Sequence, residues 1–363
     1  LGPAGCMVQS AAVALSIGAQ LGLYLGVLFV ICMVCHGELA RSRPAPRYLT
    51  SFYLAIAAGG AVGGVFVALV APRVFTEFSE YPAGLAAACL LGFAGWARSG
   101  ALAQWTSRNF AVRIPLMALL VGGTTAIVAT VTSGAQAAVA SKRNFYGILR
   151  VTQRTDKSGP WRTLRHGHVV HGTQFLQDPQ RTTTYYGPHS GVALAFNALE
   201  RPRRRVAIVG LGAGTMAAWG RAGDTFRFYE INPDVEAMAR DWFTFLKDSR
   251  ARTEVVLGDA RVQLESELDR GLSEDFDMIA VDAFSGDTIP VHLLTAECAR
   301  IYRRRLAPGG LLLLHISNRV LNLQPVAQGL AQSLGWKAAL FGSLADGDTG
   351  ESAADWVLAT ADS

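Results

Sequence analysis

The sequence predicts an α-helical transmembrane segment followed by an α/β Rossmann-like domain that begins with a small β unit. Two observations support this. Seven of the 33 basic and three of the 28 acidic residues lie in residues 1–140, which leaves 26 and 25 for the rest. The charge-poor part has apolar runs of about 20 residues, long enough to cross a bilayer, and the later part alternates strand and helix signals. We expect boundaries at 1–140, 141–178 and 179–363.

Four apolar stretches in the first part predict transmembrane helices. They cover about 10–35, 49–71, 82–97 and 114–137. The third is short and would cross only with tilt or local thinning of the bilayer. The second contains glycines at helical spacing, which predict a packing face for another helix: Gly59, Gly60, Gly63 and Gly64.

Arginines between the spans bear on their orientation. Arg41, Arg43 and Arg47 follow the first span, and the positive-inside rule places their loop in the cytoplasm. Four spans would then place the chain after residue 140 outside, whereas the nucleoside chemistry inferred below fits the cytoplasm. We expect a cytoplasmic soluble domain, so either 82–97 does not fully cross or the rule fails here.

Residues 141–178 alternate short apolar and polar runs around turn residues, which predicts a small antiparallel β unit. This segment contains His166, His168 and His171. Strand spacing places the first two on one face and the third on the other, and no Cys or acidic residue lies close in sequence. A solvated hairpin is therefore the preferred interpretation over a metal site.

A glycine-rich turn follows the next strand, 206–209, and leads into a helical stretch through Trp219. The turn is Gly210-Leu-Gly212-Ala-Gly214, and the following strand ends at Glu230, 20 residues after Gly210. Glycines let the backbone and a helix N-terminus approach a ligand closely, and the acid can accept both hydroxyls of a ribose. This order predicts an adenosine-type cofactor, with a packing turn as the alternative.

Two further carboxylates follow the third and fourth strands of this domain. Asp259 comes after 255–258, and Asp282 ends 276–282. Ligands bind at the carboxyl ends of parallel strands, so Asp259 is placed to take the adenine amino group and Asp282 to face the reacting atoms. This favours an S-adenosylmethionine-type ligand over NAD. Strands at 311–315, 337–341 and 355–360, with a helix over 324–334, complete the predicted sheet.

These motifs carry a family resemblance. From Asn144 onward the chain resembles the spermidine synthase family of aminopropyltransferases, and as a whole it resembles the bacterial membrane-fused subgroup with N-terminal transmembrane spans. The resemblance implies the fold of a class I S-adenosylmethionine-dependent transferase. The motifs that carry it, besides the glycine turn, are Tyr229-Glu-Ile-Asn-Pro, Gly258-Asp-Ala, Val281-Asp-Ala-Phe-Ser-Gly-Asp287, His36-Gly-Glu-Leu-Ala-Arg41 and Arg143-Asn-Phe-Tyr-Gly147.

The resemblance also implies a reaction and a set of site residues. An aminopropyl group moves from decarboxylated S-adenosylmethionine to a di- or polyamine, and no metal is needed because the leaving thioether is neutral. The implied catalytic residues are Asp282 and Asp287. The residues implied to bind the cofactor are Gly210, Gly212, Gly214, Glu230, Asp259 and Ala260, and those implied to bind the polyamine are Tyr185, Tyr186 and Gln174.

Three departures from the family pattern keep other functions open. Ala213 stands where the family's glycine turn has an Asp, Ser285 stands at the family's base position, and Tyr186-Gly-Pro lacks the expected amide and acid. Asp287 is the hypothesised substitute base. The alternatives are a methyltransferase that uses intact S-adenosylmethionine and a non-catalytic nucleoside- or polyamine-binding domain coupled to the membrane region.

The predicted partners follow from charge and resemblance. They are a small-molecule polyamine and the lipid bilayer of a bacterial inner membrane, and self-association into a homo-oligomer is left open. Nucleic acid is excluded, because residues 141–363 carry a net charge of only +1. The arginine clusters at 201–205 and 303–305 are interpreted as solvated surface charges.

Overall fold

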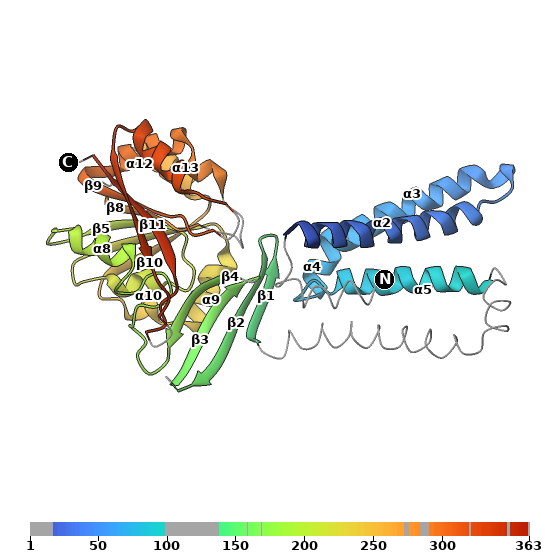
Figure 1. Cartoon of the computed structure of the whole chain (residues 1–363), viewed down its shortest axis with the longest axis horizontal. Coiled ribbons are helices and arrows are strands. Elements are labelled where there is room, and N and C mark those ends of the chain that lie inside the picture. The colour runs from blue at the N-terminus through green and yellow to red at the C-terminus, as the bar shows by residue number, and fades with distance from the viewer. Residues whose placement is uncertain are drawn as a thin grey trace. The chain divides into compact units, whose positions relative to one another are not determined.

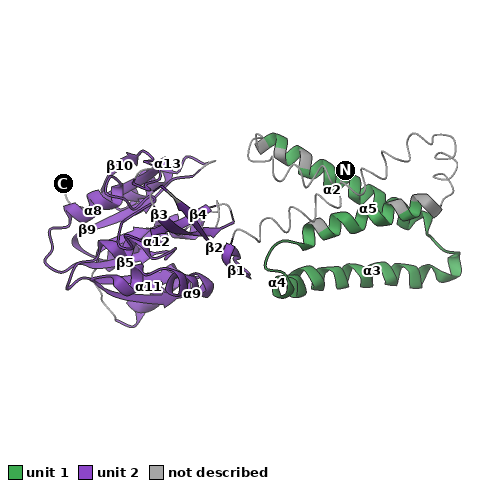
Figure 2. Ribbon diagram, turned by 90° about the horizontal axis from the view of Figure 1, so that it is seen from below, with its two compact units in different colours: residues 1–137 green, residues 138–363 purple. Residues whose placement is uncertain are grey.

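The structure is a computed structural model in which the chain forms two compact units, Leu1–Ala137 and Ala138–Ser363 (Figure 2). It describes residues 17–98, 138–157, 159–167, 169–271, 276–283, 290–318, 321–346 and 349–361. The predicted span 114–137 lies outside these residues, as do His168, Ser285 and Asp287.

The first unit is helical where it is described. Two stretches, Tyr24–Arg41 and Pro46–Val74, are long and apolar enough to cross a membrane by length and composition, and only 6% of each is buried. A shorter apolar helical stretch covers Ala83–Gly92. The elements are α2 (Ile17–Arg41), η2 (Pro46–Tyr48), α3 (Leu49–Val65), the π-helical turn η3 (Phe66–Val70), α4 (Ala71–Val74) and α5 (Glu80–Arg98).

Small residues bring α2 and α5 into close contact in this unit. A Cβ atom at Gly92 would lie 2.8 Å from a methyl group of Val34, and one at Gly95 would collide with Glu38. The four glycines expected to form a packing face lie on α3, where no other described side chain or backbone atom comes within 4 Å of their added Cβ positions. Among the described residues the close helix contact is that of α5 with α2, and the packing face on α3 stays a prediction.

The second unit opens with a four-stranded antiparallel sheet in which each strand pairs with the next (Figure 1). Its strands are β1 (Ala138–Asn144), β2 (Gly147–Asp156), β3 (Gly159–His166) and β4 (Val169–Phe175). Hydrogen bonds from Asn144 Nδ2 to Asn232 Oδ1 (2.6 Å) and Asp234 Oδ2 (2.7 Å) join the end of β1 to the start of α9 (Pro233–Trp242).

A seven-stranded sheet follows, in the order β10-β11-β9-β8-β5-β6-β7 (Figure 1). Neighbouring strands from β9 to β7 are parallel, whereas β11 is antiparallel to both of its neighbours. This order confirms the predicted α/β Rossmann-like fold of the second unit. The strands are β5 (Arg205–Val209), β6 (Thr225–Glu230), β7 (Arg252–Leu257), β8 (Phe276–Val281), β9 (Leu306–His315), β10 (Lys337–Ser343) and β11 (Ala354–Thr360).

Helices cover both faces of this sheet, which explains why its central strands are apolar at consecutive positions. Val206 and Ile208 of β5 pack into one core and Ala207 and Val209 into the other. The first core includes residues of α8 (Gly191–Ala198), η4 (Thr215–Trp219), α9 (Pro233–Trp242) and α10 (Phe245–Asp248). The second includes residues of α11 (Ala260–Asp269), η5 (Val291–Leu294), α12 (Ala296–Arg305) and α13 (Gln324–Ser333).

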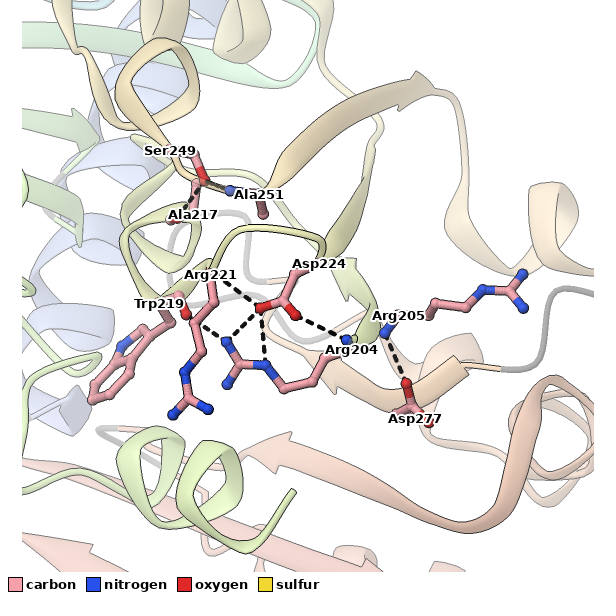
Figure 3. A network of polar contacts seen from close by, with 9 residues as sticks. All are labelled: Arg204, Arg205, Ala217, Trp219, Arg221, Asp224, Ser249, Ala251 and Asp277. Carbon is pink, nitrogen blue, oxygen red and sulfur yellow. Dashed lines mark hydrogen bonds and ion pairs between the residues drawn. The ribbon is translucent and has the colours of Figure 1, made fainter. Parts of the chain in front are cut away.

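One member of each arginine cluster is buried, so the expectation that these clusters are solvated was wrong for both residues. Arg204 is 1% exposed, and its backbone N–H and Nε–H donate to Asp224 at 2.8 and 2.9 Å (Figure 3). Arg305 is fully buried and bonds to Glu267 at 3.0 Å. A buried arginine needs a carboxylate partner to compensate its charge. Here the partners, Asp224 and Glu267, are 20 and 38 residues away in sequence from Arg204 and Arg305.

We predict that Asp224→Asn destabilises the second unit by about 3 kcal/mol, because it leaves the Arg204 charge buried without a carboxylate. The pair joins the starts of β5 and β6, so its loss loosens the strands that carry the glycine turn. Thermal unfolding of the full chain in detergent measures the effect. Asp248→Asn, at an exposed aspartate, should change stability by less than about 0.5 kcal/mol. An unchanged melting temperature for Asp224→Asn would contradict the prediction.

Candidate cofactor and active site

A cavity of about 210 Å³ lies at the carboxyl ends of β5, β6, β7 and β8, beside the four-stranded sheet. Apolar side chains from both sheets and their connections form much of its wall, including Leu149, Leu164, Val235 and Leu293. Its polar lining residues are Tyr146, His166, His171, Glu230, Asn232, Asp259, Asp282 and His292. An apolar hollow with a few converging polar groups is typical of a small-molecule site.

Two positions of the glycine turn require glycine, both because their φ angles are positive and because a side chain there would have no space. Gly210 and Gly212 have φ values of +99° and +55°, and Cβ atoms there would collide with the backbone carbonyl oxygens of Asp282 and His171. The N–H of Ala213 donates to the His171 carbonyl at 2.9 Å, which joins the turn to β4. Gly210 and Gly212 line the cavity, whereas Gly214 packs beside Leu246, away from the lining.

The turn is followed by the five-residue 3-10 helix η4, which ends at Trp219 as the predicted helical stretch does. The turn's own backbone explains the tight winding, because Gly214 is left-handed with φ +84° and its N–H donates to the Leu211 carbonyl at 2.9 Å. Ala213 is buried and packs closely against Gly172 of β4, so the space for a larger side chain is taken.

Glu230 ends β6 and is held by two backbone groups. Its Oε2 accepts from the Leu211 N–H and its Oε1 from the Asn232 N–H, both at 2.9 Å. Burial raises the pKa of this carboxyl group, and the two N–H bonds act in the opposite direction. A carboxylate oxygen can accept a second hydrogen bond, so Glu230 can still bind two ribose hydroxyls in the cavity.

Asp259 follows β7 and is fixed at the start of α11. Its Oδ1 accepts from the N–H of Val262 at 3.1 Å, and its Oδ2 lies 2.7 Å from Nε2 of His292. Ala260, the first residue of α11, lines the cavity beside it. The structure therefore places Glu230, Asp259 and Ala260 in the same cavity.

Asp282 follows β8 and lines the cavity between two hydrogen-bond partners. Its Oδ1 lies 2.7 Å from Nδ1 of His315, and its Oδ2 accepts from the Tyr186 hydroxyl. Burial opposes the charge of this carboxyl group, but the charge and hydrogen bond of His315, with the Tyr186 bond, hold its pKa below the usual value. Asp282 is thus a buried carboxylate that remains ionised.

The residues expected to bind a polyamine occupy different positions. Tyr186 reaches Asp282, and Tyr185 stacks on His315 with ring centroids 4.6 Å apart. Gln174 is buried and bonds to the Pro179 carbonyl (2.9 Å) and the Thr244 hydroxyl (3.1 Å), outside the cavity lining. Asp287 lies outside the described residues.

His166 and His171 contradict the prediction of a solvated hairpin. Both line the cavity, their ring centroids are 5.7 Å apart, and Nε2 of His166 lies 2.7 Å from the Tyr146 carbonyl oxygen. The prediction counted along one strand, but the chain turns back after His166, so His171 lies on the neighbouring strand. The clue in the sequence was the turn glycine, Gly167, between the two histidines.

We predict a pH-dependent stability from His171. Burial lowers its pKa to about 4 against the ordinary 6.5, so the unfolded chain binds this proton more readily than the folded chain. Above pH 6.5 the ring is neutral in both states and the free energy of unfolding does not depend on it. As the pH falls from 6.5 toward 4, protonation of the unfolded chain lowers the free energy of unfolding by up to about 3 kcal/mol. Melting temperatures measured from pH 7 to pH 4.5 should fall less steeply in His171→Gln than in wild type. An unaltered slope in His171→Gln would refute the prediction.

Comparison with known sequences identifies similar proteins. A polyamine aminopropyltransferase of Vibrio vulnificus is 29% identical over 182 residues, which are 49% of this chain and 59% of that protein. This chain is similar to polyamine aminopropyltransferases. A probable polyamine aminopropyl transferase of Bifidobacterium longum is 27% identical over 184 residues, 48% of this chain and 36% of that protein. The predicted resemblance is confirmed, although the matches span less than two thirds of either relative, and no family model matches.

Solved structures of the same kind are similar at lower identity. Spermidine synthase from Thermotoga maritima has a TM-score of 0.44 and 15% identity, covering 61% of this chain and 72% of that one. A probable spermidine synthase from Corynebacterium glutamicum has a TM-score of 0.46 and 21% identity, covering 62% and 80%.

Proposed function

We propose that the chain is a membrane-anchored, spermidine synthase-like transferase that moves an aminopropyl group from decarboxylated S-adenosylmethionine to a di- or polyamine. The observation that carries this proposal is the single cavity into which Glu230, Asp259 and Asp282 converge from the carboxyl ends of β6, β7 and β8. The similarity to polyamine aminopropyltransferases supports the choice of reaction.

In this proposal different residues of the cavity bind different parts of the nucleoside. Glu230 accepts the ribose hydroxyls, and Asp259 and Ala260 bind the adenine edge. The apolar wall, which includes Leu293 and Val235, covers the adenine ring. The sulfur-bearing chain then lies by Gly210 and Gly212, beside Asp282. Decarboxylated S-adenosylmethionine supplies an electrophilic carbon next to its sulfonium.

The chain's own residues would then act on the amine. The amine nitrogen forms a bond to the propyl carbon, the carbon–sulfur bond breaks, and its electron pair leaves with sulfur as a neutral thioether. An alkylammonium must lose one proton before it can attack. Asp282, ionised and buried, attracts the cationic amine and accepts that proton, while Tyr186 and His315 hold its carboxylate in place.

One observation favours the methyltransferase as a second candidate. Ala213 is buried against Gly172 at the position where the resemblance expects an Asp for the cofactor's amino end. Without that carboxylate the site loses one reason to prefer the decarboxylated cofactor. Intact S-adenosylmethionine in the same position would transfer a methyl group.

Membrane anchoring is part of the proposal and rests on α2 and on the continuous helical stretch Pro46–Val74. We place the chain in a bacterial inner membrane with the second unit in the cytoplasm, where adenosyl cofactors and polyamines are made. Cell fractionation, followed by protease treatment of spheroplasts, tests this. A carbonate-resistant membrane protein whose second unit is protected from external protease is expected, and extraction by carbonate or cleavage from outside would contradict it.

One experiment separates the proposed functions. The full chain is purified in detergent, titrated with decarboxylated and intact S-adenosylmethionine, and then assayed with putrescine, spermidine and other amines. Tighter binding of the decarboxylated form with methylthioadenosine release supports the aminopropyltransferase. Preference for the intact form with methyl transfer supports the methyltransferase, and nucleoside binding without turnover supports a sensor.

A further inference from the structure

The charge of the second unit is unevenly distributed along the chain. Residues 138–175, which contain the four strands of the antiparallel sheet, carry seven basic residues and one acidic residue, Asp156. Residues 176–363 carry 19 basic and 24 acidic residues. The near-neutral total therefore combines a sheet of net charge +6 with a remainder of net charge −5.

Four arginines lie on one face of this sheet. Arg150 and Arg165 are direct partners in the β2–β3 register, so their side chains leave the sheet on the same side. Alternation along β1 and β2 places Arg143 and Arg154 on that side as well. Leu149, which precedes Arg150, lines the cavity from the opposite side. The arginine face, Arg143, Arg150, Arg154 and Arg165, is therefore directed away from the cavity.

The charges of the arginine face act against one another. Like charges at directly opposite positions, as at Arg150 and Arg165, destabilise a strand pair. Burial lowers the pKa of Arg165, and the positive charge of Arg154 lowers it further. On the other face, by contrast, Nζ of Lys142 lies 3.2 Å from Oδ1 of Asp234. An anionic partner would compensate the repulsion within the arginine face.

An exposed aromatic residue follows Arg143 by two positions. Phe145, in the β1–β2 turn, is 95% exposed, and its ring centroid lies 5.4 Å from that of Tyr146. Asn144 holds the turn, because its Oδ1 accepts the N–H of Tyr146 at 2.9 Å and its Nδ2 donates to the start of α9. An aromatic ring held outside the fold beside basic residues is typical of proteins that contact a membrane interface.

We propose that the arginine face, with Phe145 beside it, is a docking surface for an anionic lipid bilayer. Its arginines bind headgroup phosphates, and Phe145 enters the boundary between headgroups and acyl chains. The predicted span 114–137 ends directly before β1, so the chain brings this sheet within reach of lipid, which favours a bilayer over nucleic acid. The inference rests on the proposed membrane anchoring and does not depend on aminopropyl transfer.

Docking through this face has a consequence for the cavity. The remainder of the unit has a net negative charge, so anionic lipids repel it while they attract the sheet. Leu149 and Leu164 line the cavity from the other side of the sheet. A docked sheet therefore leaves the cavity turned away from the bilayer, where water-soluble ligands can reach it.

The test places the photoreactive residue p-benzoylphenylalanine at position 145 of the full chain, reconstituted in lipid nanodiscs. One set of discs contains phosphatidylcholine alone, and the other contains equal amounts of phosphatidylcholine and phosphatidylglycerol. Mass spectrometry then counts lipid cross-links, which should be at least about tenfold more frequent in the anionic discs. The same residue in place of Leu344, which is 88% exposed and lies outside the sheet, should give equally few in both.

Charge variants in the anionic discs identify the arginines responsible. Arg150→Gln/Arg165→Gln should lower the yield at least about tenfold, since each basic residue near an anionic surface contributes about fivefold to binding. Arg150→Lys/Arg165→Lys keeps both charges and should stay within about threefold of the original yield. Arg303→Gln/Arg304→Gln, at exposed arginines of α12, should not change it. The first pair removes a repulsion, so its melting temperature should not fall.

Three results would overturn the inference. They are equal yields in the two kinds of disc, an undiminished yield in Arg150→Gln/Arg165→Gln, and binding of a single-stranded oligonucleotide that this variant loses, which would assign the face to nucleic acid. The comparison of discs leaves the charges of the sheet unchanged, so it decides the matter even if the variant unfolds. Release of methylthioadenosine in detergent needs no bilayer, so failure of the proposed transfer is measured separately from failure of docking.

Discussion

Asp282→Asn is expected to lower the rate of aminopropyl transfer about 1,000-fold while methylthioadenosine affinity changes by less than about threefold. The amide has nearly the same size as the carboxylate but cannot accept the proton that the attacking ammonium must lose. It also removes the negative charge that attracts the cationic amine. Steady-state release of methylthioadenosine, with calorimetric binding of the same nucleoside, measures both quantities.

The control for this variant is Asp269→Asn, at an exposed aspartate at the end of α11. It changes the same functional group on the surface and should leave both rate and affinity at wild-type values. Full transfer activity in Asp282→Asn would show that another group takes the proton and would remove Asp282 from the catalytic assignment.

Glu230→Ala is expected to weaken binding of methylthioadenosine about 1,000-fold, because two hydrogen bonds from ribose hydroxyls to a charged acceptor are lost. The same change frees the N–H groups of Leu211 and Asn232, so a lower melting temperature should accompany it. Glu230→Gln keeps one acceptor oxygen and should fall between Ala and wild type in both measurements.

Glu254→Gln is the matched control for Glu230, since Glu254 lies on the adjacent strand β7 with about half of its side chain exposed. Its nucleoside affinity should equal that of wild type. If Glu230→Ala kept wild-type affinity while melting lower, Glu230 would be a structural brace of the glycine turn and the ribose would bind elsewhere.

The part of the fold that could be predicted is the part that local pattern determines. Consecutive apolar positions in β5 and β8, and a carboxylate at the ends of β6, β7 and β8, predicted both the sheet and the edge where Glu230, Asp259 and Asp282 meet. Parallel strands bring their carboxyl ends together regardless of what the intervening loops do. The position of Asp282 beside Gly210 follows from this rule.

What the sequence missed depends on contacts between distant segments. Arg204 and Arg305 occur in runs that are typical of surface charge, and only the pairing with Asp224 and Glu267 makes their burial tolerable. His315 ends a strand that was predicted, yet its role depends on Asp282, 33 residues earlier, and on stacking with Tyr185 and Trp356. No local pattern encodes such a contact.

The helical stretch after the glycine turn was predicted, but its 3-10 winding was not, for a related reason. Residues after Gly214 have helical composition, and propensity alone favours an α-helix there. The left-handed Gly214, with its N–H bonded to the Leu211 carbonyl, starts the chain in a tight turn instead. The hydrogen bond from Ala213 to β4 then fixes the turn against the four-stranded sheet.

The central claim is that this cavity performs aminopropyl transfer, and one measurement tests it most directly. The purified full chain is incubated with decarboxylated S-adenosylmethionine and putrescine, and mass spectrometry quantifies methylthioadenosine and aminopropylated amine. The account predicts the two products in a one-to-one ratio for wild type and neither above background for Asp282→Asn. Methylthioadenosine without aminopropylated amine, or equal product from Asp282→Asn, would contradict it.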